Sequence, residues 1–399
     1  MQPVSSRVHP RHARRGVNPR PHRARTGLAL VTLTIAVLVI GGQSSASSGA
    51  TPLAQFNRMT FSDTASQSDP HLQVAVVQGG QGGPAYIAHL RSQHPGIRIL
   101  LYKTLWWLRP ADSAGYANCL PGSGSYPAGW YLHSSSGSQE AWNAGTSQTQ
   151  YAMDFGNTSY AQACAQKLVA DAKANGADGV MLDGAPSSLF WSNLPSACGS
   201  ATCANNTNWQ NAMTAALYRV AATMHGSGLV VYANISGGNI QCCSGGPSVW
   251  QRYMSVMDGG VEESWTYGTN HLPVRSSQVV QGIMNVAWAE AHGKYMLVND
   301  DVTNCEACSD YGLATMLLAD NGHATYDTAN GTYRGSYGPW WPSYGTAQSL
   351  GAATGPAKVL SSGLWYRPFA GGWIVVNIGS TAISDPTYGR VAANSAIIH

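Results

Sequence analysis

Charged residues are scarce in this chain. Lys, Arg, Asp and Glu together make up 10% of its 399 residues, whereas about a quarter is usual for a globular protein. Seven of the 22 basic residues lie in residues 1–50, which contain no acid, so the remainder carries 15 basic and 19 acidic residues, a net charge of −4. Nucleic-acid-binding domains need a basic surface to neutralise phosphates. The charge balance therefore disfavours nucleic acids and other polyanions as partners.

The sequence also lacks the local motifs of three enzyme classes. It contains no Gly-x-Ser-x-Gly nucleophile elbow, no His-Glu-x-x-His zinc helix and no phosphate-binding Gly-x-x-x-x-Gly-Lys loop. Its His residues are scattered, without the spacing of metal ligands. These absences argue against serine hydrolases of that type, zinc peptidases and P-loop nucleotide-binding enzymes. We expect neither a metal nor a cofactor.

No apolar run has the full length of a membrane span. The longest, residues 27–42, is shorter than the roughly 20 residues that a spanning helix needs. It follows an Arg-rich stretch and precedes small polar residues at 43–51, which is the arrangement of a secretion signal. We therefore expect residues 1–50 to be a secretion signal and the rest of the protein to be extracellular. The alternative is an uncleaved N-terminal anchor, and we expect no other membrane partner.

The chain contains eight cysteines. An even number behind a secretion signal favours disulfides. A zinc site built from Cys305 and Cys308 with another pair is an alternative, and the adjacent Cys242 and Cys243 would form a strained bridge with each other. The disulfides that the spacing indicates are Cys198 with Cys203, Cys305 with Cys308 and, over a longer separation, Cys119 with Cys164.

Residues 55–356 alternate short β-branched runs with helical patterns, which indicates a parallel sheet. Eight strands with interposed helices are typical of a (β/α)8 TIM barrel, an α/β fold of roughly 250 residues. The expected helices are 84–94, 160–175, 209–225, 249–257, 277–292 and 311–320, and a long loop, 105–149, follows the third strand. The expected strands are 57–61, 72–78, 97–103, 179–183, 229–235, 260–264, 295–299 and 323–326.

The pattern changes in residues 357–399. Two strand-like runs, 364–369 and 373–378, are joined by Ala370-Gly371-Gly372, a hairpin signal. We therefore expect a small C-terminal β appendage after the barrel.

Two acids stand at the ends of predicted strands. Asp183 directly follows the apolar run 179–182. About eighty residues later the chain repeats the same motif, an Asp-Gly pair followed by a short run that ends in an acid. Superposing Asp258-Gly259 on Asp178-Gly179 puts Glu263 at the position of Asp183. Because the carboxyl ends of barrel strands face the active site, we interpret this pair as candidate catalytic carboxylates.

The neighbouring Glu262 is the competing candidate. Strand alternation sends only one of two adjacent side chains toward the barrel interior. The superposition favours Glu263 for that position. The alternative for each acid is a structural one, as a helix cap or a solvated loop residue.

Other polar residues and several tryptophans follow the predicted strands. The polar side chains are of a kind that could hold sugar hydroxyls or restrain the carboxylates, although Asp300 also fits a turn and Asp154 a helix cap. Indole rings stack on the apolar faces of sugars, although core packing is the ordinary role of a tryptophan. The candidate substrate-binding residues are Lys103, Trp106, Trp107, Asp154, Asn234, Trp265, Asp300 and Asp327.

Four stretches carry a resemblance to a known group of proteins. Residues 178–183, 231–234, 258–265 and 365–377 resemble glycoside-hydrolase-like TIM-barrel families that are related to polygalactosaminidases and, more distantly, to α-galactosidase-type barrels. The resemblance covers most of residues 55–380. It implies a nucleophile at the end of the fourth strand, Asp183, and an acid/base at the end of the sixth, Glu263. This chain departs from the α-galactosidase-type pattern by carrying Glu instead of Asp on the sixth strand, so retention or inversion stays open.

The sequence therefore predicts a secreted glycoside hydrolase that cleaves O-glycosidic bonds of a poly- or oligosaccharide with two carboxylates. One alternative is a non-catalytic carbohydrate-binding barrel, and another is a structural cell-surface protein kept by its N-terminal anchor. A glycoside hydrolase differs from the non-catalytic barrel in that both carboxylates face one cleft, at a separation of roughly 5–9.5 Å.

Overall fold

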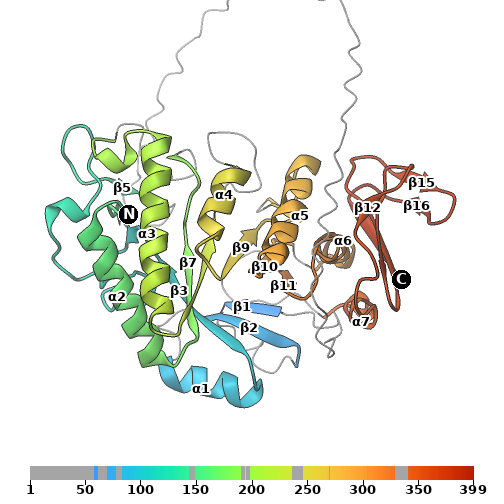
Figure 1. Ribbon diagram of the computed structural model, residues 1–399, viewed down its shortest axis with the longest axis horizontal. Helices are drawn as coiled ribbons and strands as arrows, with labels where there is room; N and C mark the ends of the chain where they lie inside the picture. The colour runs from blue at the N-terminus through green and yellow to red at the C-terminus, as the bar shows by residue number, and fades with distance from the viewer. Residues whose placement is uncertain are drawn as a thin grey trace, which may run out of the picture. The chain divides into compact units, whose positions relative to one another are not determined.

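The computed structural model (Figure 1) describes residues 58–61, 70–77, 83–142, 149–189, 194, 198–235, 246–268, 270–302, 304–328 and 340–399. The expected N-terminal signal and the cysteines 242 and 243 lie outside these residues. No helix in the described ranges has the length and apolarity needed to cross a membrane.

A sheet of eight strands, all paired in parallel, forms the centre of the fold. Its order is β1-β2-β3-β7-β8-β9-β10-β11. Each strand lies within two residues of its expected position, because β-branched and apolar runs bounded by glycine define strands well. The strands are β1 (Arg58–Phe61), β2 (Leu72–Val77), β3 (Arg98–Thr104), β7 (Gly179–Asp183), β8 (Val230–Asn234), β9 (Gly259–Glu263), β10 (Tyr295–Asp300) and β11 (Ala324–Thr328).

Each connection from β2 onward passes through a helix, and in Figure 1 these helices flank the strands that they join. The edge strands β1 and β11 contact each other, so the sheet is curled. Among the described residues no hydrogen-bonded ladder joins them. The fold is therefore a curled α/β sheet, and complete closure into a (β/α)8 barrel stays a prediction. The helices are α1 (Gly83–Gln93), α2 (Thr158–Asn175), α3 (Asn206–His225), α4 (Pro247–Met254), α5 (Ser276–Ala291) and α6 (Glu306–Leu317).

Side-chain alternation gives the sheet two faces. One residue from most strands joins a small apolar cluster on the concave face, against which Tyr102 also packs. The opposite face packs on the helices in a much larger cluster. Because alternate residues share a face, the residue two positions after each cluster member also points inward. The cluster, called the interior cluster below, consists of Val74, Val76, Leu100, Met181, Tyr232, Val261 and Leu297.

The repeated Asp-Gly pairs lie at the amino ends of β7 and β9, where the aspartates bind backbone. Asp178 Oδ2 accepts the amide N–H of Ile99 at 2.7 Å, and Asp258 Oδ2 accepts that of Val231 at 2.7 Å. Each carboxylate thus satisfies an amide group of the preceding strand in the sheet. The aspartates of the repeat are structural, at the end of the sheet opposite to Asp183 and Glu263.

The glycines of the same pairs allow close approach of neighbouring chains. A side chain at Gly179 would fall against the carbonyl oxygen of Val230, and one at Gly259 would meet that of Tyr295 at 2.6 Å. Glycine is therefore required where the two strands begin. The motif repeats because both strands meet the same packing requirement.

The expected loop 105–149 contains secondary structure. β4 (Trp107–Leu108) and β5 (Ala141–Trp142) lie within it, and both pair with β6 (Gln150–Ala152), which follows it, in a small antiparallel sheet of the order β4-β6-β5. Strands of two or three residues are too short to show a period in the sequence, so the interpretation as a loop was wrong in this respect.

The three predicted disulfides are confirmed. Their Cα atoms lie 5.3 Å apart for Cys119 and Cys164, 5.8 Å for Cys198 and Cys203, and 5.2 Å for Cys305 and Cys308. The disulfide between Cys119 and Cys164 joins the segment that follows β3 to α2. The zinc alternative for Cys305 and Cys308 is not supported, because their sulfurs are bonded to each other.

The C-terminal residues form an antiparallel sheet that packs against α6. Its central hairpin pairs Phe369 with Gly372, as the Gly-Gly signal predicted. β14 and β17 both contact α6. Division of the chain into a barrel and an appendage at residue 357 stays a prediction. The elements here are α7 (Pro342–Ser349), β12 (Lys358–Val359), β13 (Trp365–Phe369), β14 (Gly372–Asn377), β15 (Ile383–Asp385), β16 (Gly389–Val391) and β17 (Ser395–Ile398), of which β15 and β16 form a separate hairpin.

Candidate active site

Asp183 ends β7 and is held by side chains of both neighbouring strands. Its Oδ2 accepts the hydroxyl of Tyr102 at 2.5 Å, and its Oδ1 accepts the Asn234 amide at 3.0 Å. Tyr102 comes from β3 and Asn234 from β8. The carboxylate is partly buried. Each of its oxygens therefore has a fixed donor on the interior face of the sheet.

Glu263 ends β9 and is also partly buried. It follows the interior-cluster residue Val261 by two positions, as Asp183 follows Met181, so alternation directs both acids to the same face. Only β8 separates β7 from β9. Two strand spacings amount to about 10 Å between the backbones. This spacing allows both carboxylates to contact one sugar linkage.

Tyr102 lies within electrostatic reach of both acids. Desolvation by burial, and then the negative charge of Asp183, raise the pKa of its phenol well above the usual range, with a smaller contribution from Glu263 and an opposing one from Arg109. The two carboxylates thus act on one phenol.

The backbone turns sharply after each acid. Gly184, after Asp183, has φ 74°, and Ser264, after Glu263, has φ 57°. A residue other than glycine rarely adopts this left-handed conformation, which costs roughly 1–2 kcal/mol. Such strain tends to be retained at functional sites. The left-handed conformation of Gly184 and Ser264 sets the direction in which the backbone leaves each carboxylate.

Glu262 points to the other face of β9, beneath α5. It is 5% exposed. Burial raises the pKa of its carboxyl to about 8, the Asn285 amide opposes the rise, and the charge of Glu263 adds to it. Burial therefore favours the protonated form of this carboxyl. Glu262 is therefore a core residue turned away from Asp183.

Two more predicted residues share the interior face at the carboxyl ends of the strands. Asn234 donates a hydrogen bond to Asp183. Asp327 of β11 pairs in register with Asn299, which itself pairs with Glu263. The Asp327 carboxylate accepts the amide of Thr328 at 2.8 Å. The structure therefore brings Asp183, Asn234, Glu263 and Asp327 to one end and one face of the sheet.

Lys103 lies on the opposite face of its strand from Tyr102. It is 2% exposed, and its Nζ forms an ion pair with Asp171 of α2 at 2.7 Å and donates to the carbonyl oxygen of Gly115 at 2.6 Å. These contacts join β3 to α2 and to the segment that follows β3. The structure does not bring Lys103 to Asp183.

Asp300 is also on the helix side of the sheet. It accepts the amide of Thr266 at 2.6 Å, the amide of Tyr267 at 2.8 Å and the hydroxyl of Tyr326 at 2.9 Å. Burial raises the pKa of this carboxyl to about 6 despite these donors. It orders the turn after β9 from the face of the sheet opposite to that of Asp183 and Glu263.

Asp154 orders a turn before α2. Its Oδ1 accepts the amide of Gly156 at 3.0 Å and the hydroxyl of Thr202 at 2.5 Å. Burial raises the pKa of its carboxyl. Neither it nor Asp300 contacts Asp183 or Glu263 through these bonds.

The three predicted tryptophans are buried. Trp106 is 2% exposed, Trp107 8% and Trp265 1%. Trp106 packs edge-on against Trp209, with ring centroids 5.2 Å apart, and Trp265 Nε1 donates to the carbonyl oxygen of Gly312 at 3.0 Å. These rings are packed in the core, so little of their faces is open to a sugar.

Sequence reasoning missed Tyr102. The expected third strand ended at Lys103, whereas β3 continues to Thr104. The available signal was alternation from the apolar Leu100, which puts Tyr102 on the interior face and Lys103 on the other.

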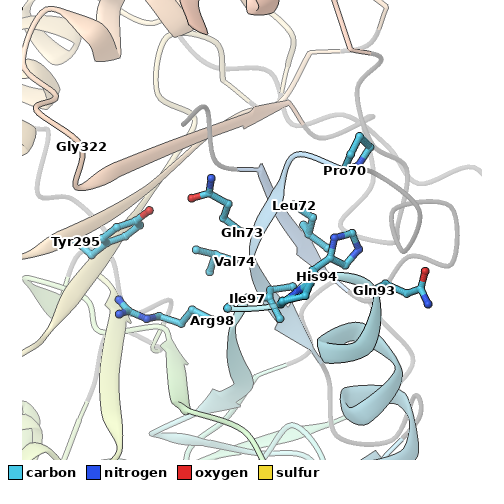
Figure 2. Close-up of a pocket in the computed structure, with 12 residues that line it drawn as sticks. Pro70, Leu72, Gln73, Val74, Gln93, His94, Ile97, Arg98, Tyr295 and Gly322 are labelled. Atoms are coloured by element: carbon cyan, nitrogen blue, oxygen red, sulfur yellow. The ribbon is translucent and has the colours of Figure 1, made fainter. Parts of the chain in front are cut away.

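A cavity of about 610 Å³ lies at the amino ends of β2, β3 and β10 (Figure 2). Figure 2 shows Arg98, Gln73 and Tyr295 around it. The Arg98 guanidinium lies 5.6 Å from the ring centroid of Tyr295 and donates to the hydroxyl of Tyr232 at 2.5 Å. Asp183 and Glu263 lie at the carboxyl ends of β7 and β9, the opposite edge of the same parallel sheet, so this cavity is separate from the carboxylates.

Comparisons with known proteins gave one family match and several structural ones. A family model described as hypothetical glycosyl hydrolase family 15 matches residues 91–373. A search of curated proteins found no match.

Three solved structures illustrate the structural similarities. The glycoside hydrolase domain of PelA from Pseudomonas aeruginosa is 14% identical, with a TM-score of 0.45 over 68% of this chain and 93% of that one. Ega3 from Aspergillus fumigatus, in complex with galactosamine, is 10% identical, with a TM-score of 0.45 over 72% and 96%. An α-amylase from Lactobacillus plantarum is 11% identical, with a TM-score of 0.47 over 86% and 98%.

Proposed function

The chain belongs to the hypothetical glycosyl hydrolase family 15, and from this premise we propose that it hydrolyses O-glycosidic bonds of a poly- or oligosaccharide with Asp183 and Glu263. The resemblance to glycoside-hydrolase-like families that the sequence motifs carry is confirmed by this membership. The observation that supports the choice of residues is their common place, at the carboxyl ends of β7 and β9 and two positions after Met181 and Val261 of the interior cluster.

Both carboxylate oxygens of Asp183 accept a hydrogen bond. Hydrogen bonds from Tyr102 and Asn234 stabilise its charged form. We assign it the role that needs a negative charge next to the anomeric carbon. In a retaining reaction it forms a bond to that carbon, and in an inverting one it takes a proton from the attacking water.

Glu263 is assigned the acid role. Its proton passes to the glycosidic oxygen as the bond from that oxygen to the anomeric carbon breaks. In the retaining route water then attacks the anomeric carbon, the bond from that carbon to Asp183 breaks, and one proton of the water passes to Glu263, so one water is consumed for each linkage. In either route the products are two sugars with free hydroxyls.

Secretion belongs to the same proposal. Three disulfides suit an oxidising environment. The expected signal sequence and the low content of charged residues fit an extracellular enzyme acting on neutral, polar glycans.

The test is a polysaccharide hydrolysis screen with reducing-end detection, on wild type beside Asp183→Asn, Glu263→Gln and the matched control Glu262→Gln. We expect wild type and Glu262→Gln to release sugar, and the other two to lose at least about 100-fold in rate, the scale of a lost acid or base. Circular dichroism melting checks that each variant is folded.

Other outcomes identify the alternatives. Activity that survives Glu263→Gln but is lost in Glu262→Gln contradicts the acid assignment. Sugar binding without release on any substrate favours the non-catalytic carbohydrate-binding barrel. The anomer that appears first, followed by proton NMR, distinguishes retention from inversion.

A further inference from the structure

We infer that Tyr102 is a positioning residue for Asp183: its hydroxyl fixes the orientation of that carboxylate and stabilises its ionised form. The role in the reaction rests on the proposed function. The contact itself, 2.5 Å from hydroxyl to Oδ2, does not depend on it.

The register of β3 and β7 explains how tyrosine reaches this carboxylate. Tyr102 is paired with Met181, and Asp183 with Thr104, so Tyr102 lies two residues nearer the amino end than Asp183. Two residues of a strand span about 6.6 Å. A tyrosine that leans along the strand covers this distance with its ring and hydroxyl, whereas a serine or threonine there would be too short.

The ring of Tyr102 is held by the sheet interior. It packs against the interior cluster, which includes Leu100 on its own strand and Met181 on the next. Phenylalanine keeps the same ring and loses only the hydroxyl. A Tyr102→Phe substitution therefore isolates the hydrogen bond from the packing.

The hydroxyl acts as a donor whenever Asp183 is ionised. Burial and the charge of Asp183 raise the pKa of the phenol, which stays protonated. The charged groups that act on this phenol are Asp183 of β7, Glu263 of β9 and Arg109, which follows β4. Asn234 supplies the second donor from β8. With one donor to each oxygen from opposite sides, the carboxylate cannot rotate without breaking a bond.

Tyr232 provides a matched control from the same interior. It is fully buried in the interior cluster, and its hydroxyl accepts from Arg98 near the amino ends of the strands. Tyr232→Phe removes the same atom from the same kind of side chain, away from Asp183.

The first measurement is the pH dependence of kcat/KM for wild type, Tyr102→Phe and Tyr232→Phe on the substrate found in the screen. We expect the acid limb of Tyr102→Phe to move up by about one pH unit, because losing a hydrogen bond to the ionised carboxylate favours its protonated form. Tyr232→Phe should keep the wild-type limb. An unchanged limb in Tyr102→Phe, or an equal shift in both variants, overturns the inference.

The second measurement needs no hydrolysis. Protein labelled with 13C at the aspartate carboxyl carbons is titrated by NMR, with Asp183→Asn identifying the signal. We expect its titration midpoint to move to higher pH in Tyr102→Phe only. A moved midpoint in a protein that cleaves no glycan means that the proposed function fails while the positioning contact stands. Glycan cleavage with an unmoved midpoint means the reverse.

Discussion

Glu262 links the stability of the protein to pH through a single side chain. Burial raises the pKa of its carboxyl from an ordinary 4.5 to about 8. In the folded state the group binds its proton more tightly than in the unfolded state, so stability falls as pH rises. The contribution is fully present below about pH 4.5 and is lost by about pH 8, on the order of 4–5 kcal/mol in total.

Glu262→Gln should remove this dependence. We expect the variant to match wild type within about 1 kcal/mol at pH 5 and to exceed it by a few kcal/mol at pH 9, because glutamine has no proton to lose. Urea denaturation at the two pH values measures the difference. Identical pH profiles for the two proteins would mean that Glu262 is accessible to water in the folded state.

The choice between neighbouring residues shows what could be predicted at this scale. Repetition of the Asp-Gly motif selected Glu263 over Glu262, and the structure has the two acids on opposite faces of β9. The place of Lys103 at the end of the expected third strand made it a candidate, whereas alternation from Leu100 points to Tyr102 instead. The burial of Trp106 and Trp265 could not be predicted from the sequence, because it depends on contacts with residues far away in the chain. One example is the carbonyl group of Gly312 in α6, which accepts a hydrogen bond from Trp265.

At the scale of elements, the parallel strands were predictable and their short companions were not. Runs of β-branched residues gave the eight strands, whereas β4, β5 and β6 gave no period. Closure of the sheet depends on the pairing of β1 with β11, which no local pattern encodes. The order and spacing of β7, β8 and β9 followed from the helices between them, and this order is what brings Asp183 and Glu263 together.

The amino ends of the strands depend on the aspartates of the Asp-Gly pairs. Asp258→Ala leaves the buried amide of Val231 without its carboxylate, and we expect a loss of about 1–2 kcal/mol in the free energy of unfolding. The control is His225→Ala, which removes only the exposed partner of Asp258, at 2.8 Å. It should cost less than about 1 kcal/mol.

Equilibrium denaturation compares these two variants. Equal losses would mean that the ion pair, and not the backbone contact, secures β9. Glycan hydrolysis by the folded fraction should be unchanged in both, since neither residue lies at the carboxyl ends of the strands.

At the scale of the whole molecule, the C-terminal sheet is joined to the α/β part of the chain by a buried arginine. Arg367 of β13 is 4% exposed and donates to the carbonyl oxygens of Leu317 at 2.6 Å and Asp320 at 2.7 Å, and to Asn321 Oδ1 at 2.6 Å. A cation at the C-terminal end of α6 also complements the helix dipole. One side chain thus joins the C-terminal sheet to the connection between α6 and β11.

Arg367→Ala should destabilise the whole chain by about 2–4 kcal/mol, because it leaves buried carbonyl groups unpaired. The exposed Arg390→Ala in the same region serves as the control and should change stability by less than about 0.5 kcal/mol. Differential scanning calorimetry measures both. We expect one transition for wild type and for each variant, and two separate transitions would show that the C-terminal sheet unfolds by itself.

The tandem of Glu262 and Glu263 has a consequence for how insertions and deletions would act on this protein over generations. If β9 slipped by one residue toward its carboxyl end, every side chain would move to the place of the next residue and change face. Glu262 would then take the inward place, and the sheet would still present a glutamate there. In β7 the neighbour of Asp183 is Leu182, so the same slip would replace the acid by a hydrocarbon. The acid of β9 can survive such an event, and the acid of β7 cannot.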